Sequence, residues 1–588
     1  MKKPSRRDFL KIGAGAVGGG LATILAQRVA PSIHLGNRRN DKPNVVVMLL
    51  DALRADHVGC YGYRRKDAHG ELVSTTPNID QFAREGTMFS KTYASSSVTM
   101  TSMFSLHSGY ERPTFDPLYE SRYSCVFPTF PEVFRDHGWR TRTISQNPFH
   151  YMCSWNTRGY AEEDILLTRR HVERGRLVDW WHAESAFKVA NEELLASVEE
   201  PFMWYIHLLP PHEPYDAPEK FYAVFDDGYK GKLPKEIYYE SGEHSEAWAD
   251  VAAKADSLKG TIGKLPAEDR KQLEALEKAL QSWHGARASV DRIRQYKDKL
   301  SAMDIEHVKT LYDANIYQAD WFVGALVTRL RLLGLLDNTI VIVTSDHGEE
   351  FMEHGGIAHD GTVYEEDIHI PLIFKLPGGA LGGRRVGDLV SMVDIPATIL
   401  DLAGIQDELG VGRSFGALLR GEASPRKRER VYSDCVGVAT REGTWKHIMY
   451  DWEVPGGDGG MLRKNTGLRE VELYDLSDDP GERKNLAEAH PDMARRFGER
   501  AKSWVEEGAE IWMEKSGSFG GPESPRGVPV WNEELMREIH VALREGRLSG
   551  KVERVGKEQL EFDKRLERPD YGLSREQVER LKALGYIR

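Results

Sequence analysis

The chain has 588 residues, 40% hydrophobic and 29% charged, which is enough for one large core and a smaller second domain. Its formal net charge of -12 argues against a nucleic-acid partner, because binding a phosphate backbone requires a basic face. The four cysteines show no CxxC spacing and indicate neither a zinc cluster nor a disulfide framework; we expect packed thiols, with a Cys125–Cys153 bridge as the alternative. This composition is typical of a large soluble enzyme.

The N-terminal residues 1–31 are expected to be an export signal rather than part of the fold. The paired residues Arg6 and Arg7 precede a weakly hydrophobic, glycine-rich stretch, 12–26, and this pattern matches a twin-arginine signal. An uncleaved N-terminal anchor is the alternative, although the stretch is short for a transmembrane helix, and we expect no membrane span in the mature chain. The sequence therefore predicts the twin-arginine export machinery as a partner and a periplasmic or extracellular location.

Two apolar runs, 44–50 and 338–343, are typical of buried strands of a parallel sheet. The first ends at Asp51, and the second is followed closely by Asp346 and His347. Ligands of open α/β sheets gather outside the carboxyl ends of the strands, and adjacent carboxylate and imidazole groups suit a divalent cation. The pattern predicts a metal site, although an Asp-His-Gly string alone more often forms a polar turn.

The segment 201–209 repeats this arrangement, because an apolar run contains His207 and leads to His212. A charged stretch, 219–304, follows and is predicted to be an inserted helical cap on the main domain. A solvated decoration or a dimer contact is the alternative for this stretch. A helix is expected over 311–333, immediately before the strand that precedes Asp346.

Short apolar runs alternate with longer helical patterns from residue 44 to 376, which predicts an α/β fold with a mostly parallel sheet. We assign 43–377 to the main domain. The glycine-rich break at 378–383 is expected to begin a smaller α+β subdomain, 378–510. Residues 511–588 are rich in charge and proline, and they are predicted to form an extended arm.

Seven strings of the chain closely resemble, in the same order, the sulfatases of the alkaline-phosphatase superfamily. They are NVVVMLLDALRADHVGCYGY, TTPNIDQFAREGTMFSKTYA, HLLPPHEPY, TSDHGEEFMEHGG, YEEDIHIPLIF, MVDIPATILDLAGI and ELYDLSDDPGERKNL. The resemblance covers about residues 44–486 and implies a three-layer α/β/α domain with a mostly parallel central sheet. It also implies a smaller C-terminal α+β domain with a short antiparallel sheet, and a metal-dependent esterase site.

The resemblance also assigns roles to individual residues. Asp51, Asp346 and His347 fall on the metal ligands of the family. His212 falls on the substrate-binding histidine of the P-H-x-P-Y loop, and His359 on a position that usually carries a Lys or His facing the ester. The metal is expected to be Mg, Mn, Ca or Zn, because carboxylate, hydroxyl and imidazole ligands suit each of them to a different degree.

One departure from the family changes the expected chemistry. Common sulfatases carry C-x-P-S-R, whose cysteine becomes formylglycine, but the corresponding stretch 99–103 reads TMTSM. No formylglycine is therefore expected, Met103 replaces the arginine, and Ala52 replaces the second of two paired aspartates. The stretch resembles instead the branch with lipoteichoic acid synthases and phosphoethanolamine transferases, in which a metal-bound threonine is the nucleophile. This branch implies Thr99 as nucleophile and as a further metal ligand.

The physical case for Thr99 is that a threonine hydroxyl needs activation, which a divalent ion at the carboxylates would supply. A helix that begins near Thr101 would also favour an anion at its N-terminus. The structural alternative is that Thr99 or Ser102 merely caps this helix. His212 and His359 are the other candidate catalytic residues, although each could be an ordinary hydrogen-bonded loop histidine. Three further histidines match no family role and are taken as structural: His57, His207 and His354.

We therefore expect an exported, metal-dependent hydrolase or transferase that acts on phosphate or sulfate esters, with phosphorus favoured because of Thr99. The substrate is expected to be a phosphorylated or sulfated glycan, lipid or small molecule. Conventional sulfate-ester hydrolysis is the alternative within the enzyme class. A non-catalytic protein that binds anionic glycans or lipids is the alternative of another class, since the formylglycine cysteine is missing.

Overall fold

The structure is a computed structural model. It describes residues 42–111, 127–147, 158–161, 164–167, 181–195, 198, 201–213, 215–231, 233, 300–359, 362–423, 427–435, 437–450 and 471–518. The predicted export signal and most of the predicted 219–304 cap and 511–588 arm lie outside these residues. None of the helices in these residues is long and apolar enough to span a bilayer.

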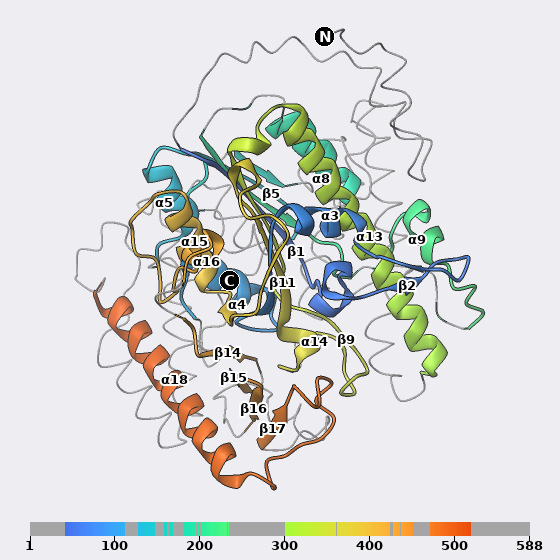
Figure 1. The fold of residues 1–588 in the computed structure, drawn as a ribbon, viewed down its shortest axis with the longest axis vertical. Helices are drawn as coiled ribbons and strands as arrows, with labels where there is room; N and C mark the ends of the chain where they lie inside the picture. The colour runs from blue at the N-terminus through green and yellow to red at the C-terminus, as the bar shows by residue number, and fades with distance from the viewer. Residues whose placement is uncertain are drawn as a thin grey trace, which may run out of the picture. The chain divides into compact units, whose positions relative to one another are not determined.

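A large central sheet organises the main domain (Figure 1). Its strands follow the order β12, β4, β11, β8, β1, β7, β5, β6, and β13 also pairs with β4. Only β11 runs against its neighbours β4 and β8, while the other pairings are parallel. The strand bounds are β1 Asn44–Leu50, β4 Thr87–Tyr93, β5 Arg140–Ser145, β6 Ile165–Leu167, β7 Phe202–Leu208, β8 Thr339–Thr344, β11 His369–Lys375, β12 Arg384–Val386 and β13 Val390–Ser391.

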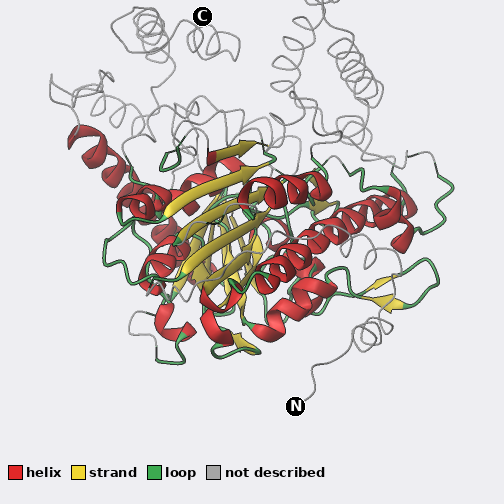
Figure 2. Cartoon of the chain, turned by 90° about the horizontal axis from the view of Figure 1, so that it is seen from above, coloured by secondary structure: helices red, strands yellow, loops and turns green. Residues whose placement is uncertain are grey.

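Strand β1 shows why both faces of this sheet are covered. All seven of its residues are buried, and they alternate between two hydrophobic clusters, with Val46 and Met48 in one and Val45 and Val47 in the other. The first cluster contains α3 (Pro77–Glu85), α8 (Ala183–Val189), α9 (Glu219–Phe225) and α13 (Ala302–Leu332), and the second contains α4 (Thr99–Ser108), α5 (Phe130–Asp136), α15 (Asp394–Leu402) and α16 (Gly416–Leu419). Figure 2 shows the sheet between these layers, which confirms the predicted three-layer fold.

The strands after the glycine-rich break at 378–383 belong to the central sheet. The sequence places 384–391 in the C-terminal subdomain, but β12 and β13 both pair in parallel with β4. Without them β4 would expose a row of backbone donors and acceptors. The break is therefore a turn between strands of one sheet, and the glycine content carries no signal that separates such a turn from a domain boundary.

A separate antiparallel sheet occupies the C-terminal region, as the fold prediction requires. Its order is β14 (Arg430–Asp434), β15 (Val438–Glu442), β16 (Trp445–Met449) and β17 (Val471–Asp475). Helix α18 (Pro491–Ser518) packs on this sheet through Phe497, Ala501 and Val505. The helix continues across residue 511, where the extended arm was expected to begin. Two short hairpins, β2 (Arg65–Lys66) with β3 (Leu72–Val73) and β9 (Glu350–Phe351) with β10 (Ile357–Ala358), complete the described strands.

A buried charge network joins the antiparallel sheet to the main domain. The Nζ of Lys446 on β16, which is fully buried, lies 2.8 Å from Oε1 of Glu482 and 3.2 Å from Oε1 of Glu365 on the short helix α14 (Glu365–Ile368). His354 donates from Nδ1 to Glu366 over 2.5 Å and from Nε2 to the carbonyl oxygen of Glu482 over 3.1 Å. Although burial opposes it, these carboxylates raise the pKa of His354, so its imidazolium belongs to the network.

His447 on β16 is a buried histidine whose protonation should loosen the packing of α18. Neither ring nitrogen has a hydrogen-bond partner within the described part of the chain, the ring stacks on Phe497, and burial lowers its pKa to about 4. A folded-state pKa below the unfolded value of ~6.5 gives stability that is lost as the pH falls from there through about 4. We expect His447→Leu to flatten the decline in melting temperature across this window, measured by circular dichroism. The exposed His69→Gln should leave it unchanged, and an unaltered decline in His447→Leu would contradict the assignment.

Candidate active site

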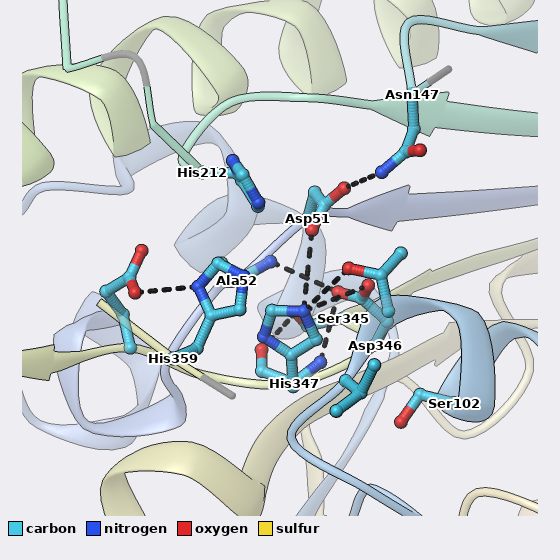
Figure 3. Close-up of polar contacts among 12 residues, drawn as sticks. Asp51, Ala52, Ser102, Asn147, His212, Ser345, Asp346, His347 and His359 are labelled. Carbon is cyan, nitrogen blue, oxygen red and sulfur yellow. Dashed lines mark hydrogen bonds and ion pairs between the residues drawn. The ribbon is translucent and has the colours of Figure 1, made fainter. Parts of the chain in front are cut away.

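The carboxyl edge of the central sheet brings together polar residues from four strand ends. Asp51 follows β1, Asn147 follows β5, His212 follows β7, and Asp346 with His347 follows β8. In Figure 3, His212 and His359 lie together beside Asp51, and Asp346 and His347 lie next to them. Because parallel strands end at one edge, residues far apart in sequence converge here.

Asp51 is fully buried, and its two oxygens have different surroundings. Oδ2 accepts hydrogen bonds from Nδ2 of Asn147 at 2.6 Å and from Nε2 of His207 at 2.9 Å. Oδ1 has no hydrogen-bond partner among the described residues. Burial alone would raise the pKa of Asp51, but the imidazoles of His212 and His207 outweigh it and hold the pKa below its usual range. Asp51 is therefore an anion with one bare oxygen.

Asp346 repeats this arrangement from the neighbouring strand. Its Oδ1 accepts from the backbone N–H groups of Ala52 at 3.1 Å and His347 at 3.0 Å, while Oδ2 has no partner among the described residues. Ala52 adopts a positive φ of 59°, an uncommon backbone conformation at the residue that donates to this carboxylate. Burial and the charge of Asp51 raise the pKa of Asp346, because two buried carboxylates repel each other.

His347 presents its Nε2 to both carboxylates and to the hydroxyl of Thr99. Its Nδ1 lies 2.8 Å from the carbonyl oxygen of Gly348, and since a carbonyl only accepts, Nδ1 carries the proton. Nε2 lies 3.8 Å from Oδ1 of Asp51, 3.4 Å from Oδ2 of Asp346 and, at hydrogen-bond distance, 2.9 Å from Oγ1 of Thr99. Three potential ligand atoms thus lie within 3.8 Å of this nitrogen.

Thr99 is the first residue of α4, and its hydroxyl is directed at the site. The helix has no side-chain cap. Ser102 has the structural role, because its Oγ donates to the carbonyl oxygen of Ser96 at 2.7 Å and accepts from the Ser96 N–H at 3.2 Å. Met103, at the position of the family's arginine, is fully buried in an apolar cluster with Phe104 and Phe127. Neither hydroxyl therefore caps the helix: Ser102 holds the preceding loop, and the hydroxyl of Thr99 contacts His347.

The donor atoms at this point fit a divalent cation. Two carboxylate oxygens without hydrogen-bond partners among the described residues, an imidazole nitrogen and a hydroxyl are typical ligands of Mg, Mn, Ca or Zn. The backbone carbonyl on Nδ1 of His347 fixes the tautomer in the way that metal-ligating histidines require. A cation here would also offset the mutual repulsion of the two buried aspartates, which contributes to the raised pKa of Asp346.

His212 and His359 form the other half of the site. Their ring centroids are 4.7 Å apart, and those of His359 and His347 are 4.5 Å apart. Nδ1 of His212 donates to the carbonyl oxygen of Glu213 at 2.6 Å, and Nδ1 of His359 lies 2.9 Å from Oε1 of Glu349. Burial opposes protonation of His212, but Glu213 and Asp51 raise its pKa. Burial and the proximity of Glu213 likewise raise the pKa of Glu349, although His359 opposes this.

The structure brings all six predicted site residues to this edge: Asp51, Thr99, His212, Asp346, His347 and His359. Four further residues were missed as members of the site: Asn147, His207, Glu213 and Glu349. His207 was expected to be structural, yet it holds Asp51. Its signal is a histidine within a fully buried strand, where an ionisable group requires a partner.

The contact of His207 with Asp51 gives a measurable prediction. His207→Leu should lower the affinity for a divalent cation by ~10–100-fold, since partners that orient a ligating carboxylate typically contribute this much. His207→Gln should retain most of the affinity, because its amide nitrogen can replace Nε2. Isothermal titration of the metal-free protein with Mn²⁺ measures both variants, and equal affinities for wild type and His207→Leu would contradict the positioning role.

Comparison with known families decides where this chain belongs. The sulfatase family model matches residues 43–405, more than half of the chain. The chain belongs to the sulfatase family. A second model, N-sulphoglucosamine sulphohydrolase C-terminal, matches residues 353–497 and covers the antiparallel sheet of this sulfatase-family hydrolase. The predicted resemblance is thereby confirmed.

Relatives of this sulfatase-family chain include arylsulfatase K from Bos taurus, 26% identical over 79% of this chain and 82% of that protein. N-acetylglucosamine-6-O-sulfatase from Bacteroides thetaiotaomicron is 23% identical over 79% of this chain and 86% of that protein. Two solved structures share the fold. The phosphonate monoester hydrolase of Agrobacterium radiobacter is 18% identical, with a TM-score of 0.53, over 79% of this chain and 96% of that one. A 2-O GAG sulfatase is 20% identical, with a TM-score of 0.54, over 85% of this chain and 100% of that one.

Proposed function

We propose that this sulfatase-family chain is a metal-dependent hydrolase or transferase of phosphate or sulfate esters that uses Thr99 as its nucleophile, with phosphorus favoured. One observation carries the proposal. Oγ1 of Thr99 lies 2.9 Å from Nε2 of His347, beside carboxylates whose facing oxygens lack hydrogen-bond partners among the described residues. A hydroxyl needs such a setting to act as a nucleophile.

The residues divide the chemistry between two halves of the site. Asp51, Asp346 and His347 would hold the cation, which lowers the pKa of a nearby hydroxyl and withdraws charge from the ester oxygens. Thr99 Oγ1 attacks the phosphorus, the bond to the leaving oxygen breaks, and the hydroxyl proton passes to water. His359 would withdraw charge from the nonbridging oxygens, and His212 would contact or protonate the leaving oxygen. Water or an acceptor alcohol then breaks the Thr99–phosphorus bond.

Two features favour phosphorus over sulfur. The chain has no cysteine in the stretch 99–103 to convert to formylglycine, and release of the group from Thr99 would then require direct attack on the transferred centre. Phosphoryl centres undergo such successive displacements when charge on the oxygens is stabilised. Relatives of this fold include a phosphonate monoester hydrolase as well as sulfatases, which supports both ester classes.

We further propose that the protein is exported by the twin-arginine route and meets its anionic ester substrate outside the cytoplasm. The support is the sequence from Ser5 to Lys11 with its paired arginines. The substrate class is a phosphorylated or sulfated glycan, lipid or small molecule, since the site presents a cation and imidazoles to an anionic ester. Fractionation of cells that produce wild type and a variant with Arg6 and Arg7 replaced by lysine tests the route, because this signal requires the arginine pair.

A side-by-side assay tests the reaction. Metal-loaded protein is offered aryl phosphate monoesters, aryl phosphate diesters and aryl sulfates, and kcat/KM is compared for the three. We expect faster cleavage of a phosphorus ester than of the sulfate. Faster sulfate cleavage would make the chain a conventional sulfatase, and no cleavage of any ester would favour the non-catalytic binder of anionic ligands.

A further inference from the structure

The strand pairing that brings the two aspartates together ends before it reaches them. The ladder between β1 and β8 extends to Leu49 and Thr344, whereas Asp51 and Asp346 each lie two residues further along their strands (Figure 3). Beyond the ladder, the backbone ties Asp51 to the strand on its other side, because its N–H donates to the carbonyl oxygen of Leu208 on β7 at 3.0 Å. The separation of the two carboxylates therefore depends on side chains that link the turn after β1 to the turn after β8.

The hydroxyl of Ser345 makes such a link. Its Oγ accepts from the N–H of Leu53 at 2.8 Å and lies 2.7 Å from the carbonyl oxygens of both Leu50 and His347. Leu50 and Leu53 flank the turn that carries Asp51, and His347 belongs to the turn after β8. Ser345 is fully buried, so a single hydroxyl holds both ligand-bearing turns inside the protein.

A second buried hydroxyl supports the turn after β1 from the helix layer. Oη of Tyr312 on α13 donates to the carbonyl oxygen of Ala52 at 2.7 Å and accepts from the N–H of Arg54 at 3.0 Å. Ala52 has the positive φ of 59°, and such a conformation persists only where the surroundings hold it. The hydroxyls of Ser345 and Tyr312 are two groups of the surroundings that do so.

We propose that Ser345 is a positioning residue that sets the separation of the Asp51 and Asp346 carboxylates for the cation. The proposal rests on the proposed function and deepens it, since it names the group that shapes the cation site before the cation binds. Without this hydroxyl, the buried N–H of Leu53 would lose its acceptor, and the turn would shift to find another. Cation binding would then have to order the two turns, and that ordering opposes binding.

Titration calorimetry of the full-length, metal-free protein with Mn²⁺ tests this role. We expect Ser345→Ala to lower the affinity by ~10-fold or more, as is typical when a partner that orients metal ligands is lost. Thr339→Val is the matched control, because it removes a buried hydroxyl at the other end of β8, where Oγ1 donates to the carbonyl oxygen of Leu335 at 2.6 Å. The control should lower the melting temperature to a similar extent and leave the Mn²⁺ affinity unchanged.

Two further measurements keep the test independent of whether Ser345→Ala folds. Tyr312→Phe keeps the aromatic ring, removes the second hydroxyl and should also lower the affinity for Mn²⁺. In wild type, hydrogen–deuterium exchange of a peptide that spans 50–56 should already be slow in the metal-free protein, and Mn²⁺ should slow it little further.

The outcomes separate this proposal from the proposed function. Equal Mn²⁺ affinities of wild type and Ser345→Ala, or an equal loss of affinity in Thr339→Val, would overturn the positioning role. Protection of 50–56 that appears only with Mn²⁺ would also overturn it. In each of these cases, ester cleavage that depends on Thr99 and on a bound cation would leave the proposed function standing. Ester cleavage by wild type with no bound cation would overturn both proposals.

Discussion

Thr99→Ala is expected to lower kcat for an aryl phosphate diester by on the order of 10³-fold or more, which is typical for loss of a nucleophile. The variant removes the Oγ1 that lies 2.9 Å from Nε2 of His347. It should not remove a cap from helix α4, because the hydrogen bonds that hold the preceding loop come from Ser102 and not from Thr99. The melting temperature should therefore stay near that of wild type. Steady-state kinetics and circular dichroism measure the two properties on the same preparation.

Two matched variants separate the nucleophile from the surrounding loop. Thr99→Ser keeps a hydroxyl and should retain substantial turnover, while Ser102→Ala should lower stability more than kcat, because it removes the hydrogen bonds to Ser96. Mass spectrometry of wild type quenched during turnover should find a phosphoryl group on Thr99. Undiminished turnover in Thr99→Ala would remove Thr99 from the nucleophile role, whatever the other variants do.

Asp346→Asn should change stability in opposite directions with and without metal. In the metal-free protein, burial and the neighbouring Asp51 raise the pKa of Asp346, so its ionised form destabilises the fold. An acid whose pKa is raised on folding loses stability as the pH rises above its unfolded value, and the amide avoids this loss. The metal-free variant should therefore melt above metal-free wild type at pH 8.

Bound metal should reverse this order of melting temperatures. Wild type should gain ~2.7 kcal/mol of stability at a cation concentration one hundred times its Kd, a gain that the variant largely lacks at that concentration. The amide oxygen of Asn can still accept the N–H groups of Ala52 and His347, so the local backbone is preserved. Differential scanning calorimetry with chelator and with Mn²⁺ provides the comparison. A variant that melts below wild type under both conditions would contradict the proposed metal role of Asp346.

The parts of the fold that the sequence predicts well are those with unbroken apolar runs. Strands β1, β7 and β8 lie adjacent at the centre of the sheet and are buried on both faces, so they have long apolar sequences. Strand β5 reads RTRTIS and pairs with β7 in parallel. Because its residues are mostly polar, it has no apolar run from which a strand could be predicted. The helix predicted over 311–333 is the C-terminal part of α13, which begins at Ala302.

The site residues that the sequence predicts are likewise those next to apolar strands. Asp51, Asp346 and His347 stand at the ends of apolar strands, and that position is visible in the sequence. Asn147 follows the unrecognised strand β5, so nothing in the sequence places it within 2.6 Å of Asp51. Glu213 and Glu349 adjoin predicted residues, but whether they contact the site depends on how loops from different strands meet.

The charge network around Lys446 means that the antiparallel sheet is not a detachable module. Glu365 stands a few residues after the hairpin strand β10 that leads to His359, and its partners Lys446 and Glu482 come from the C-terminal region that contains the antiparallel sheet. A protein truncated after residue 405 would contain every residue proposed for catalysis. It would also contain acidic side chains stripped of their buried lysine, so a minimal catalytic fragment should include the C-terminal sheet.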